Sequence, residues 1–250
     1  MGFPPRCDIP MTAFDSQQIR NGLLRALPAG DLERLAPHLE PVELPFRMSL
    51  QIADAPVDAV YFPQSGICSV VMTSSGNRQI EVGLFGYDGV SGAFLATGVD
   101  RAPYECFVQG AGHGLRLDAG VFTAAMQQSE ALRAVILRFA QVFTVQVAQT
   151  ALANGQYTLE ERLARWLLMC HDRADGDELI ITHEFIGLML GVRRAGVTVA
   201  LQTLEGKQTI RSKRRRILVV SREKLEQAAA GSYGLPEAEY RRLIGPFRKL

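Results

Sequence analysis

The sequence has few of the patterns that mark an enzyme or a metalloprotein. Its four cysteines, Cys7, Cys68, Cys106 and Cys170, stand tens of residues apart without a CxxC pair, so zinc and iron–sulfur clusters have no local scaffold. Its four histidines form no HExxH motif, and it has neither a GxSxG motif nor a P-loop. We therefore expect no metal, no cofactor and no catalytic activity.

Long apolar runs are also scarce. No stretch reaches the roughly 18 uncharged apolar residues that a membrane helix needs. Pro4, Pro5, Asp8 and Pro10 interrupt the N-terminal segment, which is not the pattern of a signal peptide. We therefore expect a cytoplasmic protein without membrane contact, in which residues 1–15 form a flexible arm.

The net charge is small, only +1 over 250 residues, but it is unevenly distributed. The segment from Thr182 to Lys224 holds ten Lys or Arg against three Glu, a net of +7, so the remainder carries −6. Such asymmetry within one chain indicates a polyanion-binding module attached to a module of another kind.

Residues 41 to 117 alternate short β-prone runs with turn residues, and two short leucine-rich helical segments precede them. The predicted strands are Val57–Phe62, Ile67–Thr73, Gln79–Phe85, Tyr104–Val108 and Leu115–Leu117. Several short strands at this spacing are typical of an antiparallel sandwich or barrel.

A long helix is predicted from about Ser129 to Ala153, and Asn154-Gly155 should end it. Its apolar residues occupy more than one face, so the helix needs cover on two sides. The β-rich domain can cover one side, and the same helix of a second copy in a twofold dimer can cover the other. A wholly buried helix in a monomer is the alternative. The predicted dimer contacts are Leu132, Ile136, Phe139, Phe143 and Val147.

Two short helices separated by a glycine follow within the basic segment. Thr182 is a suitable N-cap for a helix over His183–Leu190, and Gly191 permits a sharp turn after it. A second helix, Arg193 to Leu204, has apolar residues at i, i+3, i+4 and i+7, namely Val197, Ala200, Leu201 and Leu204. This pattern predicts a helix-turn-helix whose second helix enters the major groove of DNA.

The segment from Ile210 to Val220 is predicted to form a strand, a basic turn and a second strand, which together are the wing of a winged helix. Its cations suit phosphates, which position a protein without specifying sequence. Arginine at the start of the second helix can instead bind guanine bidentately. The predicted DNA contacts are Thr182, His183, Arg193, Arg194, Gly196, Thr198 and Gln202 in the helices, and Arg211, Lys213 and Arg214 in the wing.

The order of β-rich domain, long apolar helix and winged helix-turn-helix resembles the CRP/FNR superfamily of bacterial transcription regulators. The similarity lies in Thr182 to Arg194, continuing through Val197 and Leu201 to Glu205, and in Gly86-Tyr87-Asp88-Gly89-Val90-Ser91-Gly92. It covers about Asn21 to Leu225. The resemblance implies an α+β fold with an N-terminal antiparallel jelly-roll barrel like a cyclic-nucleotide-binding domain, flanking helices, a long dimerisation helix and a C-terminal winged helix-turn-helix.

The resemblance further implies a homodimer that reads a near-palindromic operator through a recognition helix at 193–205. The implied division is an arm at 1–15, a sensor domain at 16–128, a dimerisation helix at 129–154, a DNA-binding domain at 155–225 and a C-terminal tail at 226–250. RNA polymerase is a further candidate partner.

Several positions depart from the family pattern. Ala195 and Val199 stand where relatives often have an acid and a second arginine, so we expect a different operator sequence. Ala93 replaces the glutamate that holds a ribose, and Arg101-Ala102-Pro103 is only part of the phosphate-binding motif. Because a buried phosphate would lack its partners, we predict that cyclic AMP does not gate the protein, and the effector is unknown.

Two alternatives stay open. The winged helix could belong to a ligand-binding signalling or protein-interaction module that binds no specific DNA. The sensor domain could hold haem through Cys106 or His113, although a single such residue is more often structural. The favoured reading is a transcription regulator that is not an enzyme.

Overall fold

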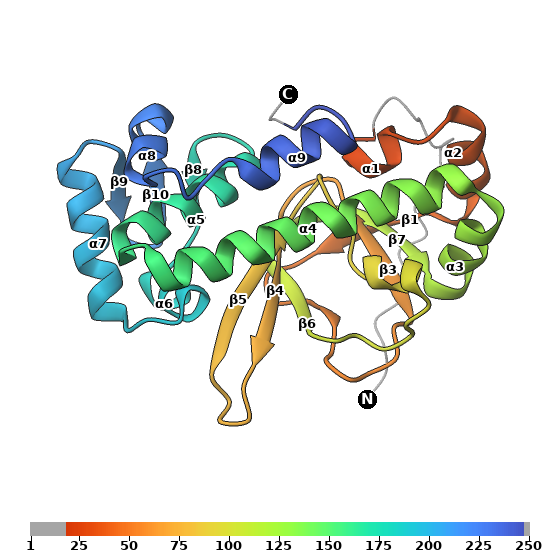
Figure 1. The fold of residues 1–250 in the computed structure, drawn as a ribbon, viewed down its shortest axis with the longest axis horizontal. Coiled ribbons are helices and arrows are strands. Elements are labelled where there is room, and N and C mark those ends of the chain that lie inside the picture. The colour runs from red at the N-terminus through yellow and green to blue at the C-terminus, as the bar shows by residue number, and fades with distance from the viewer. Residues whose placement is uncertain (1–18, 248–250) are drawn as a thin grey trace.

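The computed structural model describes residues 19–247, so the predicted flexible arm and Cys7 lie outside the described residues. One long helix, α4 (Glu130–Gln156), runs along the molecule (Figure 1). The β-rich sensor part lies against α4, and the winged helix sits at the C-terminal end of α4. The predicted order of β-rich domain, long helix and winged helix is confirmed.

Two antiparallel sheets build the sensor part, with strand orders β1-β7-β3 and β2-β6-β4-β5. The predictions for Ile67–Thr73 and Gln79–Phe85 are confirmed without a shift at either end. Over residues 19–247 the strands form two open sheets and not one closed barrel, and the α+β class is confirmed. The strands are β1 (Glu40–Leu44), β2 (Ser49–Gln51), β3 (Ala59–Pro63), β4 (Ile67–Thr73), β5 (Gln79–Phe85), β6 (Glu105–Gly110) and β7 (Gly112–Asp118).

Strand β1 escapes the sequence pattern because it lies at a sheet edge and is largely exposed. Only Leu44 of this strand is buried, and Pro41 would be excluded from a central strand. Its pairing with β7 places Glu40 opposite Arg116, whose Nη1 lies 2.9 Å from Glu40 Oε2. Tertiary pairing, and not an apolar pattern, therefore defines this strand.

Apolar side chains from both sheets and from the flanking helices share one core. Phe62 of β3 and Phe122, in the helix that follows β7, meet edge to face, with ring centroids 6.0 Å apart. The flanking helices are α1 (Gly22–Arg25), α2 (Ala29–Leu35), two 3₁₀ turns at Ala36–His38 and Ala93–Thr97, and α3 (Ala119–Gln128). These elements fix the β-rich part against α4.

Helix α4 corrects two predictions. Asn154 and Gly155 do not end it, because a glycine near a helix end costs only about 1 kcal/mol and the helix continues to Gln156. The predicted dimer contacts Leu132, Ile136 and Phe139 are buried in the core of their own chain, so their side chains are not available to a partner. Of the predicted contacts, only Phe143 and Val147 are half-exposed.

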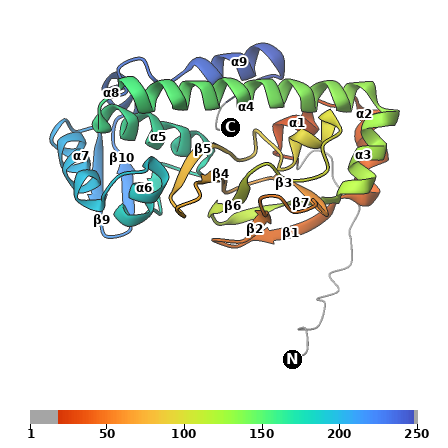
Figure 2. The same cartoon turned by 60° about the horizontal axis from the view of Figure 1, so that its bottom comes forward.

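Within the described chain, α4 is also the one helix whose length and composition would allow it to cross a membrane, and 33% of its apolar 18-residue stretch is buried. The core helix of a soluble protein can have the same length and composition. In Figure 2, α4 lies between the sheets and a C-terminal helix, α9 (Leu235–Leu243). Its apolar character is thus partly explained by this cover.

The winged helix begins directly after α4. A capping box starts α5 (Leu159–Arg173): Glu161 N–H donates to Thr158 Oγ1, and Thr158 N–H donates to Glu161 Oε2 at 2.8 Å. The remaining elements are β8 (Glu178–Leu179), α6 (His183–Leu190), α7 (Arg194–Gly206), β9 (Ile210–Lys213), β10 (Arg216–Val219) and α8 (Arg222–Ala228), with sheet order β8-β10-β9. This is the predicted winged helix.

The C-terminal segment folds back along α4 to the sensor part. Gln149 of α4 donates from Nε2 to the carbonyl of Ser232 at 3.1 Å. Tyr240 and Phe247 are buried in the sensor core, with ring centroids 5.2 Å apart. The segment predicted as a tail is therefore a second link between the two parts.

Candidate nucleic-acid interface

The turn between α6 and α7 is fixed by two glycines. Gly191 adopts the left-handed conformation (φ +65°) that ends α6. Gly187 lies under the turn, where a Cβ would meet the Val192 carbonyl at 2.9 Å, and Val192 N–H donates to the Gly187 carbonyl at 2.8 Å. Thr182 caps the helix by accepting from Phe185 N–H at 3.1 Å, as predicted. These contacts hold the two helices at a fixed angle.

The recognition helix α7 has one buried face and one open face. Val197, Ala200, Leu201 and Leu204 are all buried, which confirms the predicted core face. Arg193 occupies the N-cap position, Arg194 begins the helix, and Gln202 lies two turns further on, all three exposed. The side chains of Arg193 and Arg194 make no hydrogen bond or ion pair with any residue in 19–247. They are therefore free to meet a polyanion.

Three predicted contacts lie differently. Gly196 is half-buried and faces α5, because a Cβ there would lie 3.1 Å from Leu159 Cδ2. The His183 ring bridges the recognition helix and the wing, with Nδ1 3.2 Å from Thr198 Oγ1 and Nε2 3.4 Å from Ser212 Oγ. His183 and Thr198 therefore position the wing against α7.

Val199 is a feature of the open face that the predicted contacts omit. It is 62% exposed, on the same side of α7 as Gln202. Apolar side chains at such positions suit the methyl group of thymine. The sequence could have indicated this role, because Val199 stands where relatives often have an arginine on the recognition helix.

The wing divides its cations into paired and unpaired ones. Arg216 pairs with Glu178 at 3.1 Å. The exposed side chains of Arg211, Lys213 and Arg214 have no such partner within residues 19–247. Glu205 of α7 accepts from Ser212 N–H at 3.1 Å, which ties the wing to the recognition helix. Arg215 takes a left-handed turn conformation (φ +62°), which favours glycine.

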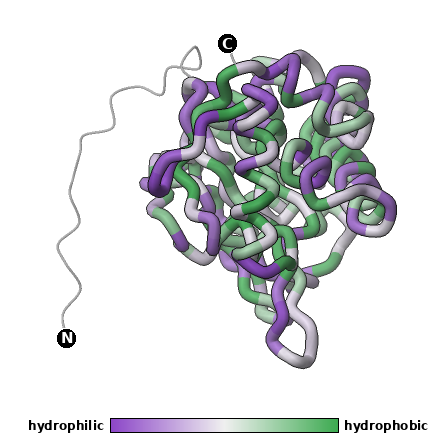
Figure 3. Tube along the Cα trace, turned by 90° about the vertical axis from the view of Figure 1, so that its left-hand side faces the viewer, coloured by the Kyte–Doolittle hydropathy of each residue, from purple (hydrophilic) through white to green (hydrophobic). Residues whose placement is uncertain are grey.

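Viewed from the winged-helix end, hydrophobic segments gather toward the middle of the molecule and many hydrophilic segments lie at its periphery (Figure 3). The N-terminal turn of α7 and the wing carry the exposed cations without an anionic partner among the described residues: Arg193, Arg194, Arg211, Lys213, Arg214 and Arg215. This placement suits contact of Arg193 and Arg194 with base edges and of the wing cations with phosphates.

Comparison with known proteins agrees with this geometry. Residues 161–228 match the family model of the Crp-like helix-turn-helix domain. The chain has the CRP/FNR fold with a Crp-like helix-turn-helix domain. The predicted resemblance is confirmed.

Solved structures share this fold across the chain. FixK2 from Bradyrhizobium japonicum is similar with a TM-score of 0.64 and 17% identity, over 76% of this chain and 96% of that one. A CRP-family transcriptional regulator from Thermus thermophilus has a TM-score of 0.64 and 19% identity, over 77% and 98%. A CRP/FNR-family regulator from the same organism has a TM-score of 0.61 and 15% identity, over 77% and 100%. No curated protein matches the sequence.

The sensor part contains an apolar cavity of about 290 Å³ between the sheets and α4, and this cavity is partly open to the surface. None of its lining residues is charged, and five of them are aromatic: Phe85, Phe94, Tyr104, Phe139 and Phe143. Gln51 also lines it, and its buried Nε2 has no hydrogen-bond partner among the described residues. Arg101 does not line the cavity, since its Nη1 donates to the carbonyl of Asp54 at 2.8 Å. An anionic ligand would find no cation here.

The residues considered for haem lie apart from this cavity. Cys106 is fully buried in β6, and burial raises the pKa of its thiol well above the usual range. His113 is exposed on β7, with Nδ1 2.7 Å from Ser65 Oγ. The described residues contain no group of three or more His, Cys, Asp or Glu that could hold a metal ion.

Buried polar contacts join the winged helix to the sensor part. Arg173 of α5 forms a buried bidentate pair with Asp88, at 2.6 and 2.9 Å. Glu81 of β5 accepts from Trp166 Nε1 at 2.6 Å and from Ser69 Oγ at 2.5 Å. Burial raises the pKa of Glu81 to about 7.

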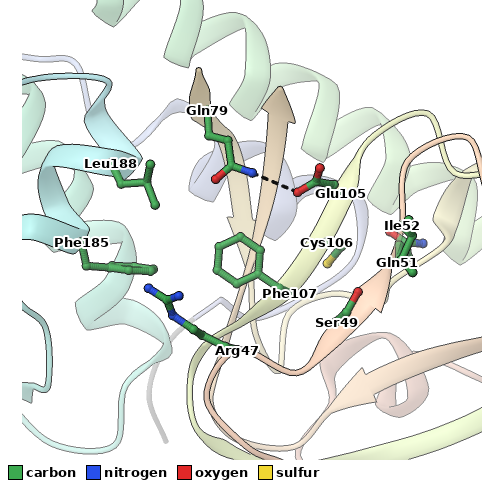
Figure 4. Close-up of a pocket in the computed structure, with 10 residues that line it drawn as sticks. All are labelled: Arg47, Ser49, Gln51, Ile52, Gln79, Glu105, Cys106, Phe107, Phe185 and Leu188. Carbon is green, nitrogen blue, oxygen red and sulfur yellow. Dashed lines mark hydrogen bonds between the residues drawn. The ribbon is translucent and has the colours of Figure 1, made fainter. Parts of the chain in front are cut away.

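Aromatic contacts join the same two parts. Phe185 of α6 lies with its ring centroid 6.0 Å from that of Phe46 and 6.4 Å from that of Phe107. Figure 4 shows Phe185 and Leu188 of α6 facing Phe107 and Arg47 of the sensor part across a pocket. These contacts fix the orientation of α6, and of the helix-turn-helix to which it belongs, relative to the sensor part.

Proposed function

We propose that this chain is a homodimeric transcription regulator that reads a near-palindromic operator with α7 and that cyclic AMP does not gate it. The proposed domains are a sensor domain at 16–128, a dimerisation helix at 129–154, a DNA-binding domain at 155–225 and a segment at 226–250 that returns to the sensor. The proposed location is the cytoplasm, without membrane contact. For an activator, RNA polymerase would be a further partner.

The free cations of the open face carry the DNA-binding proposal. Six exposed arginine or lysine side chains, on α7 and on the wing, have no anionic partner among residues 19–247. An unpaired cation pair at the start of a recognition helix suits guanine, and unpaired wing cations suit phosphates. Ala195 and Val199 in place of the family's acid and arginine support an operator unlike the usual one.

In vitro selection of bound DNA from a random pool, followed by salt titration, tests this function. We expect an enriched site with twofold symmetry and half-sites about 10 base pairs apart. Its affinity should fall steeply with salt, by a slope of about −0.9 in log K per log salt for each phosphate contact. Weak binding that changes little with salt and enriches no sequence would favour the alternative, a signalling or protein-interaction module.

An exposed stripe on α4 supports the dimer and replaces the buried contacts of the sequence prediction. Alternating steps of four and three residues separate its members, which is the spacing of a coiled-coil seam. In Figure 1, α4 runs in front of the sheets, and its side toward the viewer is not covered by another element. Its members are all exposed: Leu137, Gln141, Thr144, Ala148, Ala151 and Gly155. Small side chains allow two such helices to approach closely.

Sedimentation velocity of a Leu137→Glu/Ala148→Glu variant tests this interface. We expect monomers, because two carboxylates per chain would be buried opposite their copies. Arg138→Glu changes the charge of the same helix outside the stripe, and this control should remain dimeric. A dimer that survives the double substitution would refute the stripe.

The charge-free sensor cavity supports independence from cyclic nucleotides. A phosphate buried there would lack a cation, and Ala93 offers no carboxylate to a ribose. Calorimetric titration with cyclic AMP should therefore show no heat of binding at millimolar nucleotide. Saturable binding would overturn this part of the proposal.

A further inference from the structure

A second cavity lies outside the sensor pocket, between the sensor part and the winged helix. Its volume is about 540 Å³, within the range of small-molecule sites, roughly 300–1,000 Å³. Ile67, Gly110 and Ala111 form its sensor wall, and Ile181 and Phe185 belong to its winged-helix wall. A bound molecule would therefore touch both parts.

Exposed apolar side chains stand on both walls of this interdomain cleft. Phe46, from the loop between β1 and β2, is 53% exposed, and Ile180, just before α6, is 75% exposed. Large exposed apolar side chains that gather at one concave site are typical of a surface that binds a ligand. The body of the occupant should therefore be apolar.

The charged side chains of the cleft indicate which charge the other end of the bound molecule should carry. Four charged side chains line it, and three of them are paired. Arg173 binds Asp88, Asp175 binds Arg20 at 2.7 Å, and Glu178 binds Arg216 at 3.1 Å. The fourth, Arg215, is exposed and its guanidinium has no hydrogen bond or ion pair within residues 19–247. The cleft therefore offers one uncompensated positive charge.

We propose that this interdomain cleft is a binding site for an amphipathic monocarboxylate, with its apolar body between Phe46 and Ile180 and its carboxylate on Arg215. A guanidinium binds a carboxylate through charge-assisted hydrogen bonds, which are stronger than neutral ones. Arg215 is the turn residue of the wing, and its carbonyl accepts from Ile181 N–H at 3.1 Å. Occupancy would fix the wing against the sensor part.

Calorimetric titration of the full chain with decanoate, without DNA, tests the site. We expect one site per chain, with little binding of decylamine, which has the same body and the opposite charge. Because DNA is absent, the result does not depend on the proposed function, and either can fail alone. Equal binding of decanoate and decylamine would overturn the proposal.

Two neighbouring arginines give a matched pair of variants. Arg215→Ala should weaken decanoate binding roughly tenfold or more, the usual effect of losing a charged hydrogen bond. Arg214→Ala removes a cation from the same turn, but Arg214 does not line the cleft, so its decanoate affinity should stay unchanged. Equal weakening by both would show a general effect of surface charge and refute the site.

Filling variants distinguish the two cavities. Ala111 is exposed on the cleft wall, so Ala111→Trp should occupy the cleft without disturbing a core and should abolish decanoate binding. Val147→Phe fills the sensor cavity and should leave decanoate binding intact. Circular dichroism melting checks that both variants fold. The reverse result would place decanoate in the sensor cavity and overturn the proposal.

Discussion

The two sides of the winged helix treat charge in opposite ways. On its outer side, Arg193, Arg194, Arg211, Lys213 and Arg214 are exposed and have no anionic partner among the described residues. On its inner side, against the sensor part, Arg173 and Asp88 are buried and paired at 2.6 Å. The winged helix thus has unpaired charges on the side where DNA would bind and paired charges on the side that packs against the sensor part of the same chain.

This difference follows from the cost of desolvation. A buried ion remains only if a partner compensates its lost hydration, and removing that partner is costly. An exposed cation keeps its hydration at little cost and can exchange it for a phosphate. Substitutions on the inner side should therefore change stability, and substitutions on the outer side should change DNA binding.

The largest effect is expected from Asp88→Ala. It leaves Arg173 buried without its carboxylate, so the free energy of unfolding should fall by about 3–5 kcal/mol. Urea unfolding measures this loss. Arg20→Ala removes an exposed pair with Asp175 between the same two parts and should cost less than about 1 kcal/mol. Similar small losses in both variants would contradict the contrast between buried and exposed pairs.

Glu81 should make stability depend on pH. Burial raises its pKa from 4.5 to about 7, so between these values the folded chain holds a proton that the unfolded chain has lost. The stabilisation that this proton contributes is complete below pH 4.5, decreases as pH rises and is absent above pH 7. Over this range the free energy of unfolding falls by up to about 3 kcal/mol. Glu81→Gln should flatten urea-unfolding free energies measured from pH 5 to 8. Glu43→Gln, on the exposed edge strand, is the control, and an unchanged slope in Glu81→Gln would refute this role.

Arg194→Ala tests the outer side. It should reduce affinity for the selected operator by about 1–3 kcal/mol, because a bidentate contact to guanine is lost, and affinity for random DNA much less. Lys213→Ala should weaken both DNAs alike and lower the salt slope by about 1. Fluorescence anisotropy with both DNAs measures the difference, and urea unfolding should change in neither variant. Equal losses on both DNAs for Arg194→Ala would place it on a phosphate.

The local patterns of the winged helix predicted its structure closely. The cap at Thr182, the turn at Gly191 and the apolar spacing of Val197 to Leu204 each involve residues within one or two helical turns. Strands β4 and β5 were equally clear because both are apolar runs bounded by turn residues. By contrast, α9 was missed because its segment is mostly polar, and its packing against α4 and the sensor core depends on residues far away in the chain.

Sequence alone determined the order of the elements, the recognition helix and the cations of its open face, since helical spacing and charge are properties of neighbouring residues. The tertiary structure decided which face of α4 is free, because Leu132, Ile136 and Phe139 pack on their own sheets while Leu137 and Ala148 do not. It also decided which wing arginine belongs to the interdomain cleft, because pairing across a fold depends on residues far apart in the chain.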